Sequence, residues 1–195
     1  MLPIACEMYK RTILSVDPRR MFGVTTLDTV RGSTFVSEVL QISPDCVQVP
    51  VIGGHSPNSL VPVLSHIKPC IDLTTEETVR ITRAIQEAGC ESDRGKPKPR
   101  TSTLSGAFAI ARFVTALAKG LAGQAGVVEC SYVMSNVIPT ISYLSTQVEL
   151  GPDGVQKNLG VPEITDYECC LMETALPFIK SDILKGEEFT AKSQK

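Results

Sequence analysis

Three polar side chains in the first third of the chain, Asp28, Arg31 and His55, could together transfer a proton. Asp28 and Arg31 share one face of an α-helix, which places a carboxylate beside a guanidinium. A carboxylate can orient an imidazole, and a guanidinium offers a planar fork of donors, so the set suits proton transfer on a substrate that carries a carboxylate. The alternative is an exposed ion pair and an unrelated loop histidine, and spacing alone favours this simpler interpretation.

The elements that must position these side chains lie between Met21 and His55. The pattern predicts a short strand over Phe22–Thr26, a helix over Leu27–Leu40 and an apolar strand that ends in Val49–His55. A glycine pair immediately precedes His55. Small residues at this point leave room for a ligand to approach the backbone.

The composition is that of a soluble globular protein. The chain has 195 residues, 43% of them hydrophobic and 21% charged, which suffices for one domain with a real core. A formal net charge of -2 provides no broad attraction for nucleic acid or an anionic membrane, so we expect neither partner. No window approaches the roughly 20 uninterrupted apolar residues of a membrane span.

The cysteines indicate thiols rather than disulfides or metal ligands. They are odd in number and scattered, and none forms a C-x-x-C pair. This usage is typical of a reducing compartment, and we expect no metal site. The seven are Cys6, Cys46, Cys70, Cys90, Cys130, Cys169 and Cys170.

The remaining pattern predicts an α+β domain. Residues 105–121 have the pattern of a buried helix. The two predicted strands 126–134 and 140–150 are joined by a short connection, which predicts a hairpin. Prolines make 93–103, the one strongly basic segment, a solvated loop. Predicted helices cover 1–14, 74 or 75 to about 89, 105–121 and 165–186; predicted strands cover 126–134, 140–150 and the neighbourhood of Val155.

Known cofactor motifs are missing from these residues. There is no G-x-G-x-x-G, no P-loop, no H-E-x-x-H and no G-x-S-x-G. The nearest glycine cluster, Gly120, Gly123 and Gly126, has the wrong spacing and precedes a strand. The residues by themselves therefore indicate an α+β domain with a candidate proton-transfer dyad and no cofactor site.

Several segments resemble the malate dehydrogenase family. Phe22–Arg31 is similar to its active-site helix, and Val49–His55 is similar to its catalytic-histidine strand, with glycines typical of the mitochondrial and bacterial branch. Further matching segments follow in the same order, so the resemblance covers nearly the whole chain. It implies the C-terminal substrate domain of the lactate/malate dehydrogenase superfamily, a mixed or antiparallel sheet packed with long helices, without the N-terminal Rossmann domain.

The resemblance also implies a role for each candidate residue. His55 would accept the proton from the malate hydroxyl as a hydride leaves for NAD, and Asp28 would orient His55 and stabilise the imidazolium. Arg31 would bind the substrate carboxylate with two prongs. The implied reaction is the NAD-dependent interconversion of L-malate and oxaloacetate, a step of the tricarboxylic acid cycle.

Two departures from the family concern the cofactor. The dinucleotide-binding half is missing, so residues 1–20 are interpreted as the helix that follows it, 21–188 as the substrate domain and 189–195 as a polar tail. The loop 96–101 is basic and proline-rich where the family has glycine and alanine, and Gly106 replaces a methionine that faces the nicotinamide. Thr101 and Gly106 remain candidates for contacts at the cofactor edge.

Two functional hypotheses follow. The chain is the catalytic part of a malate dehydrogenase that is incomplete alone, or it is a truncated, non-catalytic paralogue that pairs with itself or with a full-length dehydrogenase. The resemblance implies the mitochondrial matrix. Because the first twenty residues form no convincing transit peptide, the cytoplasm is the alternative.

Overall fold

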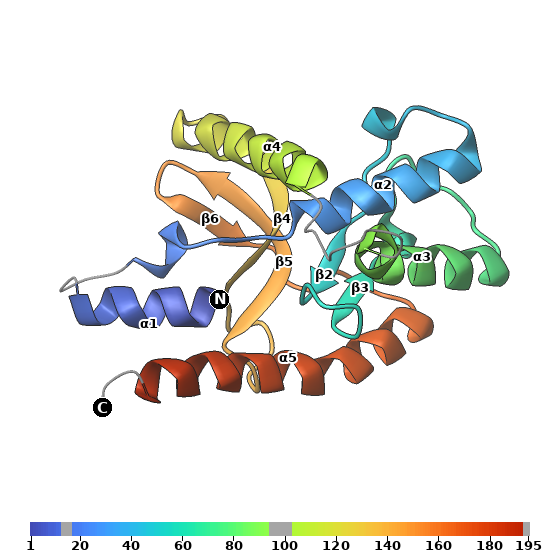
Figure 1. Cartoon of the computed structure of the whole chain (residues 1–195). Coiled ribbons are helices and arrows are strands. Elements are labelled where there is room, and N and C mark those ends of the chain that lie inside the picture. The colour runs from blue at the N-terminus through green and yellow to red at the C-terminus, as the bar shows by residue number, and fades with distance from the viewer. Residues whose placement is uncertain (13–16, 94–102, 193–195) are drawn as a thin grey trace.

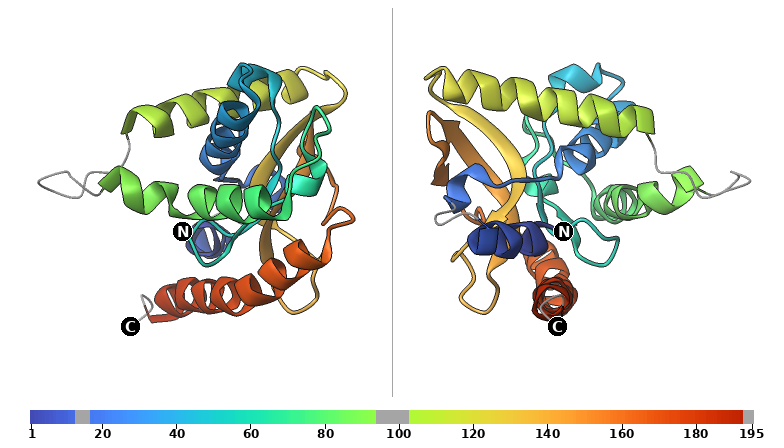
Figure 2. Two further views of the ribbon diagram at one scale, coloured as in Figure 1. Left: turned by 90° about the vertical axis from the view of Figure 1, so that its right-hand side faces the viewer. Right: turned by 60° about the vertical axis from the view of Figure 1, so that its left-hand side comes forward.

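The computed structural model describes residues 1–12, 17–93 and 103–192, and it places an antiparallel sheet between two layers of helices (Figures 1 and 2). The α-helices are α1 (Leu2–Thr12), α2 (Thr26–Leu40), α3 (Thr75–Asp93), α4 (Thr103–Leu121) and α5 (Asp166–Lys192). The strands are β1 (Gly23–Val24), β2 (Val51–Gly53), β3 (Leu60–Pro62), β4 (Val127–Met134), β5 (Tyr143–Gly151) and β6 (Gly154–Asn158). The predicted α+β class is confirmed.

The sheet is built around β4 and β5. Its path is β1-β4-β5-β2-β3, with β6 paired to β5, and every pairing is antiparallel. The predicted hairpin is confirmed, with Val127 opposite Leu150 at one end and Met134 opposite Tyr143 at the other. In all views α4 lies along one side of the sheet and α5 along the other (Figure 2).

The short strands β2 and β3 are buried on both faces, as their unbroken apolar sequences require. On one face Ile52 and Val61 belong to a core cluster that includes Ile179 of α5. On the other face Val51 and Leu60 belong to a second cluster that lies under α2 and α3. Each such side chain contributes about 1.5–3 kcal/mol on burial. This packing anchors the strand that leads to His55.

Helix α5 is tied to the rest of the domain by a buried carboxylate. Glu168 is only 2% exposed, and its carboxylate accepts hydrogen bonds from the backbone N–H and hydroxyl of both Ser65 and Thr165, at 2.7–3.0 Å. Thr165 caps the helix in return, because its hydroxyl accepts from the Glu168 backbone N–H. One side chain thus caps α5 and joins it to the segment after β3.

The predicted end of the last helix at Gly186 is wrong, whereas Gly89 lies near the end of its helix, which is one of the two positions predicted for it. Helix α3 runs through Gly89 to Asp93, and α5 runs through Gly186 to Lys192, so most of the predicted polar tail is helical. A glycine ends a helix when it turns left-handed, and neither of these has a positive φ. A Cβ on Gly186 would lie 3.3 Å from Pro3, so this glycine instead lets α1 cross α5 closely.

The remaining differences are smaller. The predicted strand over Phe22–Thr26 shrinks to Gly23–Val24, and the predicted strand ending in Val49–His55 shrinks to β2. Helix α5 continues past Pro177 and curves along its length, as expected from a helical proline (Figure 1). The six cysteines whose side chains are described are free thiols.

Helix α4 is less buried than its sequence suggests. Ala109 and Phe113 point inward, whereas Phe108, Ile110 and Val114 are more than half exposed. By length and composition its residues Leu104–Leu121 could cross a membrane. Arg112 on this helix, however, forms an ion pair with Glu129 of β4 at 3.2 Å, and the helix packs on β4 and β5. We therefore interpret α4 as a helix that covers the sheet.

The Glu168 contact leads to a stability prediction. Burial opposes ionisation of Glu168, but the hydrogen bonds from Ser65 and Thr165 outweigh it and lower the pKa. Glu168→Gln should reduce the free energy of unfolding by about 1–3 kcal/mol at pH 7, measured by urea denaturation. The loss should shrink as the pH falls through the lowered pKa, because the contribution of a carboxylate with a depressed pKa disappears there.

The matched control is Glu173→Gln, which changes an exposed carboxylate of the same helix. It should leave the free energy of unfolding within about 0.5 kcal/mol of the parent. Equal effects of the two substitutions would contradict the role of Glu168 as the anchor of α5.

Candidate active site

The first turn of α2 places a carboxylate in the interior. The helix begins at Thr26, and Asp28 is 1% exposed. A carboxylate in the first turn is favoured by the positive end of the helix dipole. Thr25, immediately before the helix, is anchored to the sheet through its hydroxyl, which lies 2.8 Å from the Ser145 hydroxyl of β5. The start of the helix, and with it Asp28, is therefore fixed on the sheet.

The glycine pair before His55 is required by the chain itself, and Gly54 also lines the cavity that lies beside His55. Gly53 has φ +94°, and a Cβ there would overlap the Ser59 carbonyl oxygen; a Cβ on Gly54 would overlap the Ser59 hydroxyl. The Gly54 N–H donates to that carbonyl oxygen at 2.7 Å, and Ser59 Oγ lies 2.7 Å from Ser56 Oγ. The glycines permit a tight turn that presents His55.

Asp28 and His55 meet across the 27 positions that separate them in sequence. His55 Nδ1 lies 2.6 Å from Asp28 Oδ2, and the histidine side chain is 57% exposed while the carboxylate is buried. Nδ1–H donates to the carboxylate, so Nε2 is the nitrogen that exchanges a proton with a ligand. The bond to Asp28 raises the pKa of His55, and this effect exceeds the opposing effects of burial and of Arg31. The pair can therefore act as a proton-transfer dyad.

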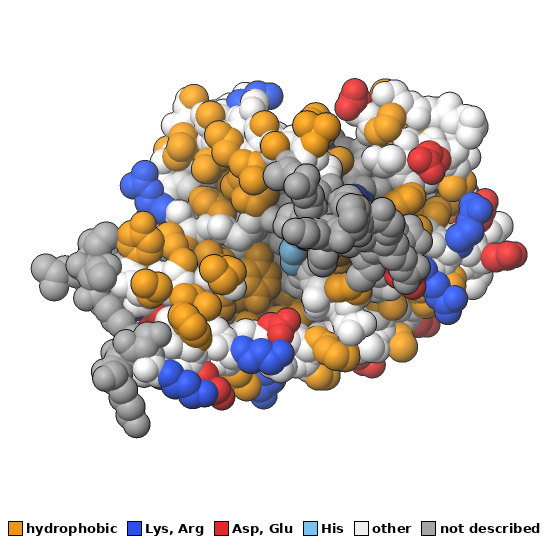
Figure 3. Space-filling model, viewed as in Figure 1, with side chains coloured by type: hydrophobic (Ala, Val, Ile, Leu, Met, Phe, Trp, Pro, Cys, Tyr) orange, Lys and Arg blue, Asp and Glu red, His pale blue; other side chains and the backbone are white. Residues whose placement is uncertain are grey.

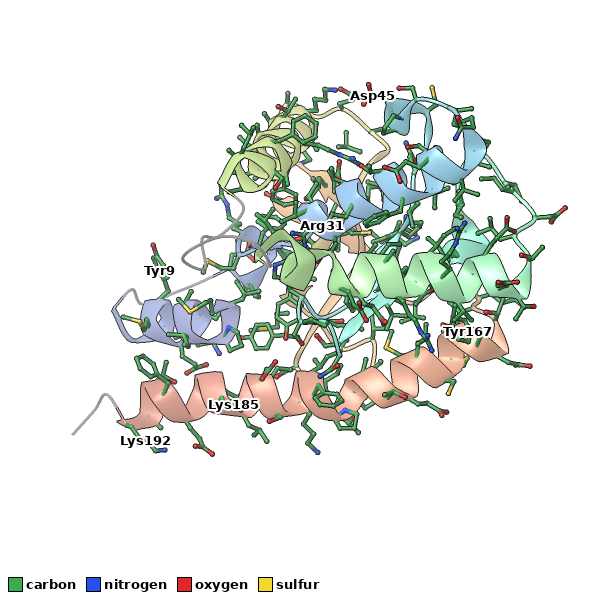
Figure 4. All side chains as sticks on the ribbon, turned by 45° about the vertical axis from the view of Figure 1, so that its right-hand side comes forward. Tyr9, Arg31, Asp45, Tyr167, Lys185 and Lys192 are labelled. Atoms are coloured by element: carbon green, nitrogen blue, oxygen red, sulfur yellow. The ribbon has the colours of Figure 1, made fainter. Side chains whose placement is uncertain are left out.

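Arg31 completes the group predicted from sequence. Its Nη1 lies 3.7 Å from Asp28 Oδ1, an oxygen that accepts no hydrogen bond from any described residue, and its side chain is 18% exposed. Figure 4 shows Arg31 between α2 and the C-terminal end of α3. All three candidate residues are thus brought together, with Asp28 as the shared partner.

Gly89 of α3 is a neighbour of the site that sequence reasoning did not identify. The nearest atom to a Cβ placed on it is Arg31 Nη1, at 3.6 Å, and no other atom of the described residues is found within 4 Å beyond its own helix backbone and chain neighbours. The glycine therefore leaves space on that side of the guanidinium. The available signal was a glycine inside a strongly helical segment, where it costs about 1 kcal/mol relative to alanine.

A cavity of about 400 Å³ lies beside His55. Its walls come from the beginning of α1, from β1, from the turn after β2, from β4 and from α5, and include Ser56, Tyr132 and Asp182. Burial raises the pKa of Tyr132, so its hydroxyl stays neutral. Figure 3 shows apolar side chains over α1 and α4 on the face that carries this hollow.

The described residues provide less evidence for a cofactor or metal site than for the proton-transfer dyad. Thr101 lies outside them, as does the loop 96–101. Gly106 lies in the first turns of α4, and a Cβ there would meet no atom of the described residues within 4 Å beyond its own helix backbone and chain neighbours. No glycine-rich turn precedes a described helix to hold a pyrophosphate, so these residues do not fit NAD as a whole. In residues 1–12, 17–93 and 103–192, no three His, Cys, Asp or Glu side chains are grouped to hold a metal ion.

Comparison with known protein families shows the family to which this chain belongs. The family model of the lactate/malate dehydrogenase alpha/beta C-terminal domain matches residues 25–190. The chain belongs to this family. The match includes α2 and the turn after β2, so the predicted resemblance and fold are confirmed.

Curated relatives narrow the resemblance to malate dehydrogenases. The mitochondrial malate dehydrogenases of Felis catus and Caenorhabditis elegans are each 43% identical over 188 residues, and that of Homo sapiens is 41% identical. The alignments cover 96% of this chain but 55%, 54% and 55% of the respective relatives. The chain therefore spans about half the length of the curated relatives it matches.

Solved structures agree on the fold. The malate dehydrogenase of Picrophilus torridus superposes with a TM-score of 0.78 at 21% identity, over 98% of this chain and 60% of that one. The enzyme of Aeropyrum pernix gives 0.75 at 18% identity, over 94% and 60%. At these identities the likeness supports the shared architecture of this lactate/malate dehydrogenase domain.

The dyad leads to a titration prediction. In Asp28→Asn the pKa of His55 should fall toward the ordinary value of about 6.5, because the charged acceptor that favours the imidazolium is removed. The shift can be measured by NMR titration of the histidine ring protons, and the chain has only one other histidine, His66, as an internal reference. An unchanged His55 titration would contradict the dyad.

The sign of the linked stability follows from the raised pKa. The Asp28–His55 contact should stabilise the fold fully below about pH 6.5 and progressively less as the pH rises through the raised pKa. The difference in free energy of unfolding between the parent and Asp28→Asn should therefore narrow toward alkaline pH.

Proposed function

We propose that this domain supplies the proton-transfer and carboxylate-binding half of a malate dehydrogenase site. The observation that carries the proposal is the 2.6 Å contact between Asp28, buried at the start of α2, and the exposed His55. The names of the relatives point to malate and oxaloacetate as the substrate pair. Their mitochondrial description favours the matrix as the compartment.

Each residue has a defined role in this proposal. Arg31 binds a carboxylate of malate, for which its planar fork of donors is suited. His55 Nε2 accepts the proton of the substrate hydroxyl as the alcohol is oxidised, and it returns the proton in the reverse direction. Asp28 stabilises the imidazolium that forms, since its carboxylate lies against Nδ1 and is shielded from water.

NAD is the hydride acceptor that the family implies. Because the described residues do not form a dinucleotide site, no hydride step is assigned to them. We propose that turnover requires a nucleotide-binding segment joined to, or associated with, this domain. Positioning of the two reactants is worth many orders of magnitude in rate, so the 195-residue chain alone should show no measurable turnover.

A chimera tests the proposal directly. The nucleotide-binding half of a mitochondrial relative, joined ahead of Met1, should produce malate-dependent NAD reduction, followed by absorbance at the NADH band. His55→Ala in the chimera should lower kcat by roughly 100- to 10,000-fold, as expected for loss of a general base. Arg31→Lys should raise KM for malate because the two-pronged contact is lost.

The controls separate folding from chemistry. Circular dichroism and NAD binding verify each chimera, and Lys180→Gln, an exposed change on α5, should leave kcat and KM unchanged. A folded, NAD-binding chimera without turnover would overturn the proposed activity. Turnover by residues 1–195 alone, abolished by His55→Ala, would overturn the requirement for a further segment.

A second candidate function is that of a non-catalytic interaction partner. The observation that favours it is the exposed apolar face of α4, where Leu104 is 86% exposed and Phe108 58% exposed. Apolar side chains gathered on one helix mark interaction surfaces. A second copy of this chain or a full-length dehydrogenase would cover the face.

This candidate predicts a change of assembly. The parent chain should form a dimer in light scattering at micromolar concentration, and Phe108→Glu should convert it to a monomer, because a charge would be buried in the contact. The control is Leu184→Glu, which places the same charge on an exposed apolar position of α5. A monomeric parent, or equal effects of the two variants, would rule out α4 as the contact.

A further inference from the structure

A small polar cavity lies apart from the candidate active site. It has a volume of about 100 Å³ and lies between α2, α4, the hairpin of β4 and β5, and the segments that flank β2 and β3. None of its lining residues borders the cavity beside His55. Neither the proton-transfer dyad nor Arg31 contributes to it, so the proposed reaction leaves it without a role.

Its charged side chains leave a net positive charge. Arg112 of α4 and Glu129 of β4 neutralise each other, with Arg112 Nε donating to Glu129 Oε1 at 3.2 Å. Lys68 also lines the cavity, and no carboxylate of the described residues lies within ion-pair distance of its ammonium group. One cation thus remains uncompensated in a space with a single, already paired carboxylate.

The position of Lys68 is fixed by its backbone. Its N–H donates to the Gln48 carbonyl oxygen at 2.8 Å, and the Gln48 N–H donates back to the Lys68 carbonyl oxygen at 2.9 Å. Nearby His66 is held through Nε2, which lies 2.7 Å from the Glu163 carbonyl oxygen. The backbone that carries Lys68 is therefore fixed, while the lysine itself is exposed.

The neutral side chains add hydrogen-bond donors. Gln48 and Gln147, whose side chains carry amides, line the cavity. Thr29 also lines the cavity and is only 5% exposed. Its hydroxyl has no oxygen or nitrogen partner among the described residues. The only polar neighbour found for it there is the weakly polar thiol of Cys130. A buried hydroxyl without a partner is uncommon in folded proteins and indicates a missing partner.

We propose that this cavity binds a small oxyanion of the phosphate class. The geometry combines an unpaired Lys68, the Arg112 guanidinium, a buried unpartnered Thr29 hydroxyl and two amides, which are donors suited to an acceptor that carries four oxygens. A divalent cation is not favoured, because the only carboxylate is committed to Arg112. The volume is several times what a water needs, and it suits one tetrahedral group.

The neighbouring surface allows two sources for that group. A second cavity, of about 410 Å³, shares Arg112 and Glu129 and adds Lys119. A free phosphate ion would occupy the small cavity alone. The phosphate of a monoester would place its organic part in the second cavity.

The test is a titration of the isotope-labelled 195-residue chain with inorganic phosphate, followed by NMR at constant ionic strength adjusted with sodium chloride. Saturable shifts should appear at Thr29 and Gln147, whereas chloride alone should produce none. Lys68→Gln should weaken phosphate binding at least 5-fold. Lys180→Gln, which removes the same charge from an exposed position on α5, should leave it unchanged.

A second variant keeps the test independent of net charge. Thr29→Val preserves the shape of the side chain, removes the hydroxyl and should weaken binding about 3-fold or more; unchanged His55 ring resonances confirm that the adjacent dyad is intact. Absence of saturation in the parent, or equal weakening by Lys68→Gln and Lys180→Gln, would overturn the proposal. Tighter binding of glycerol 3-phosphate than of phosphate would support the site and assign it to a monoester, and the reverse order would support a free oxyanion.

Discussion

The contact between a buried carboxylate and an exposed imidazole is the constraint on which the arrangement of this domain depends. Removing a carboxylate from water is costly unless it is paired, and Asp28 is paired on one oxygen by His55 and approached on the other by Arg31. Both partners must therefore reach the first turn of α2 from fixed directions. The glycine turn after β2 sets one direction, and the helix itself sets the other.

The rest of the fold fixes the position of the glycine turn after β2 relative to helix α2. Strands β2 and β3 are apolar on both faces and are held between α5 on one side and α2 with α3 on the other. Glu168 fixes the start of α5 to the segment that follows β3. A strand so short would be marginal alone, and its position is determined by the two cores that enclose it.

The family assignment rests on most of the chain, whereas the proposed chemistry rests on a few residues. Membership of the lactate/malate dehydrogenase family rests on a match over residues 25–190, and it agrees with the antiparallel sheet and the long helices. In the proposed function, proton transfer and carboxylate binding need only the residues around Asp28. Hydride transfer needs a dinucleotide site, which requires a backbone cradle for phosphate that the described residues do not provide. On the proposed function, the described residues account for proton transfer and not for hydride transfer.

Sequence alone determined the local features that depend on residue type and spacing. The alternation and turns of the β4–β5 hairpin, the start of α2, the cap at Thr165 and the sharing of a helix face by Asp28 and Arg31 are short-range effects. Tertiary structure decided what depends on neighbours distant in sequence. Whether His55 met Asp28, how closely Gly53 and Gly54 approached Ser59, and whether Gly186 ended α5 or admitted α1 depended on packing partners. A glycine permits several conformations, and only the surrounding contacts select one.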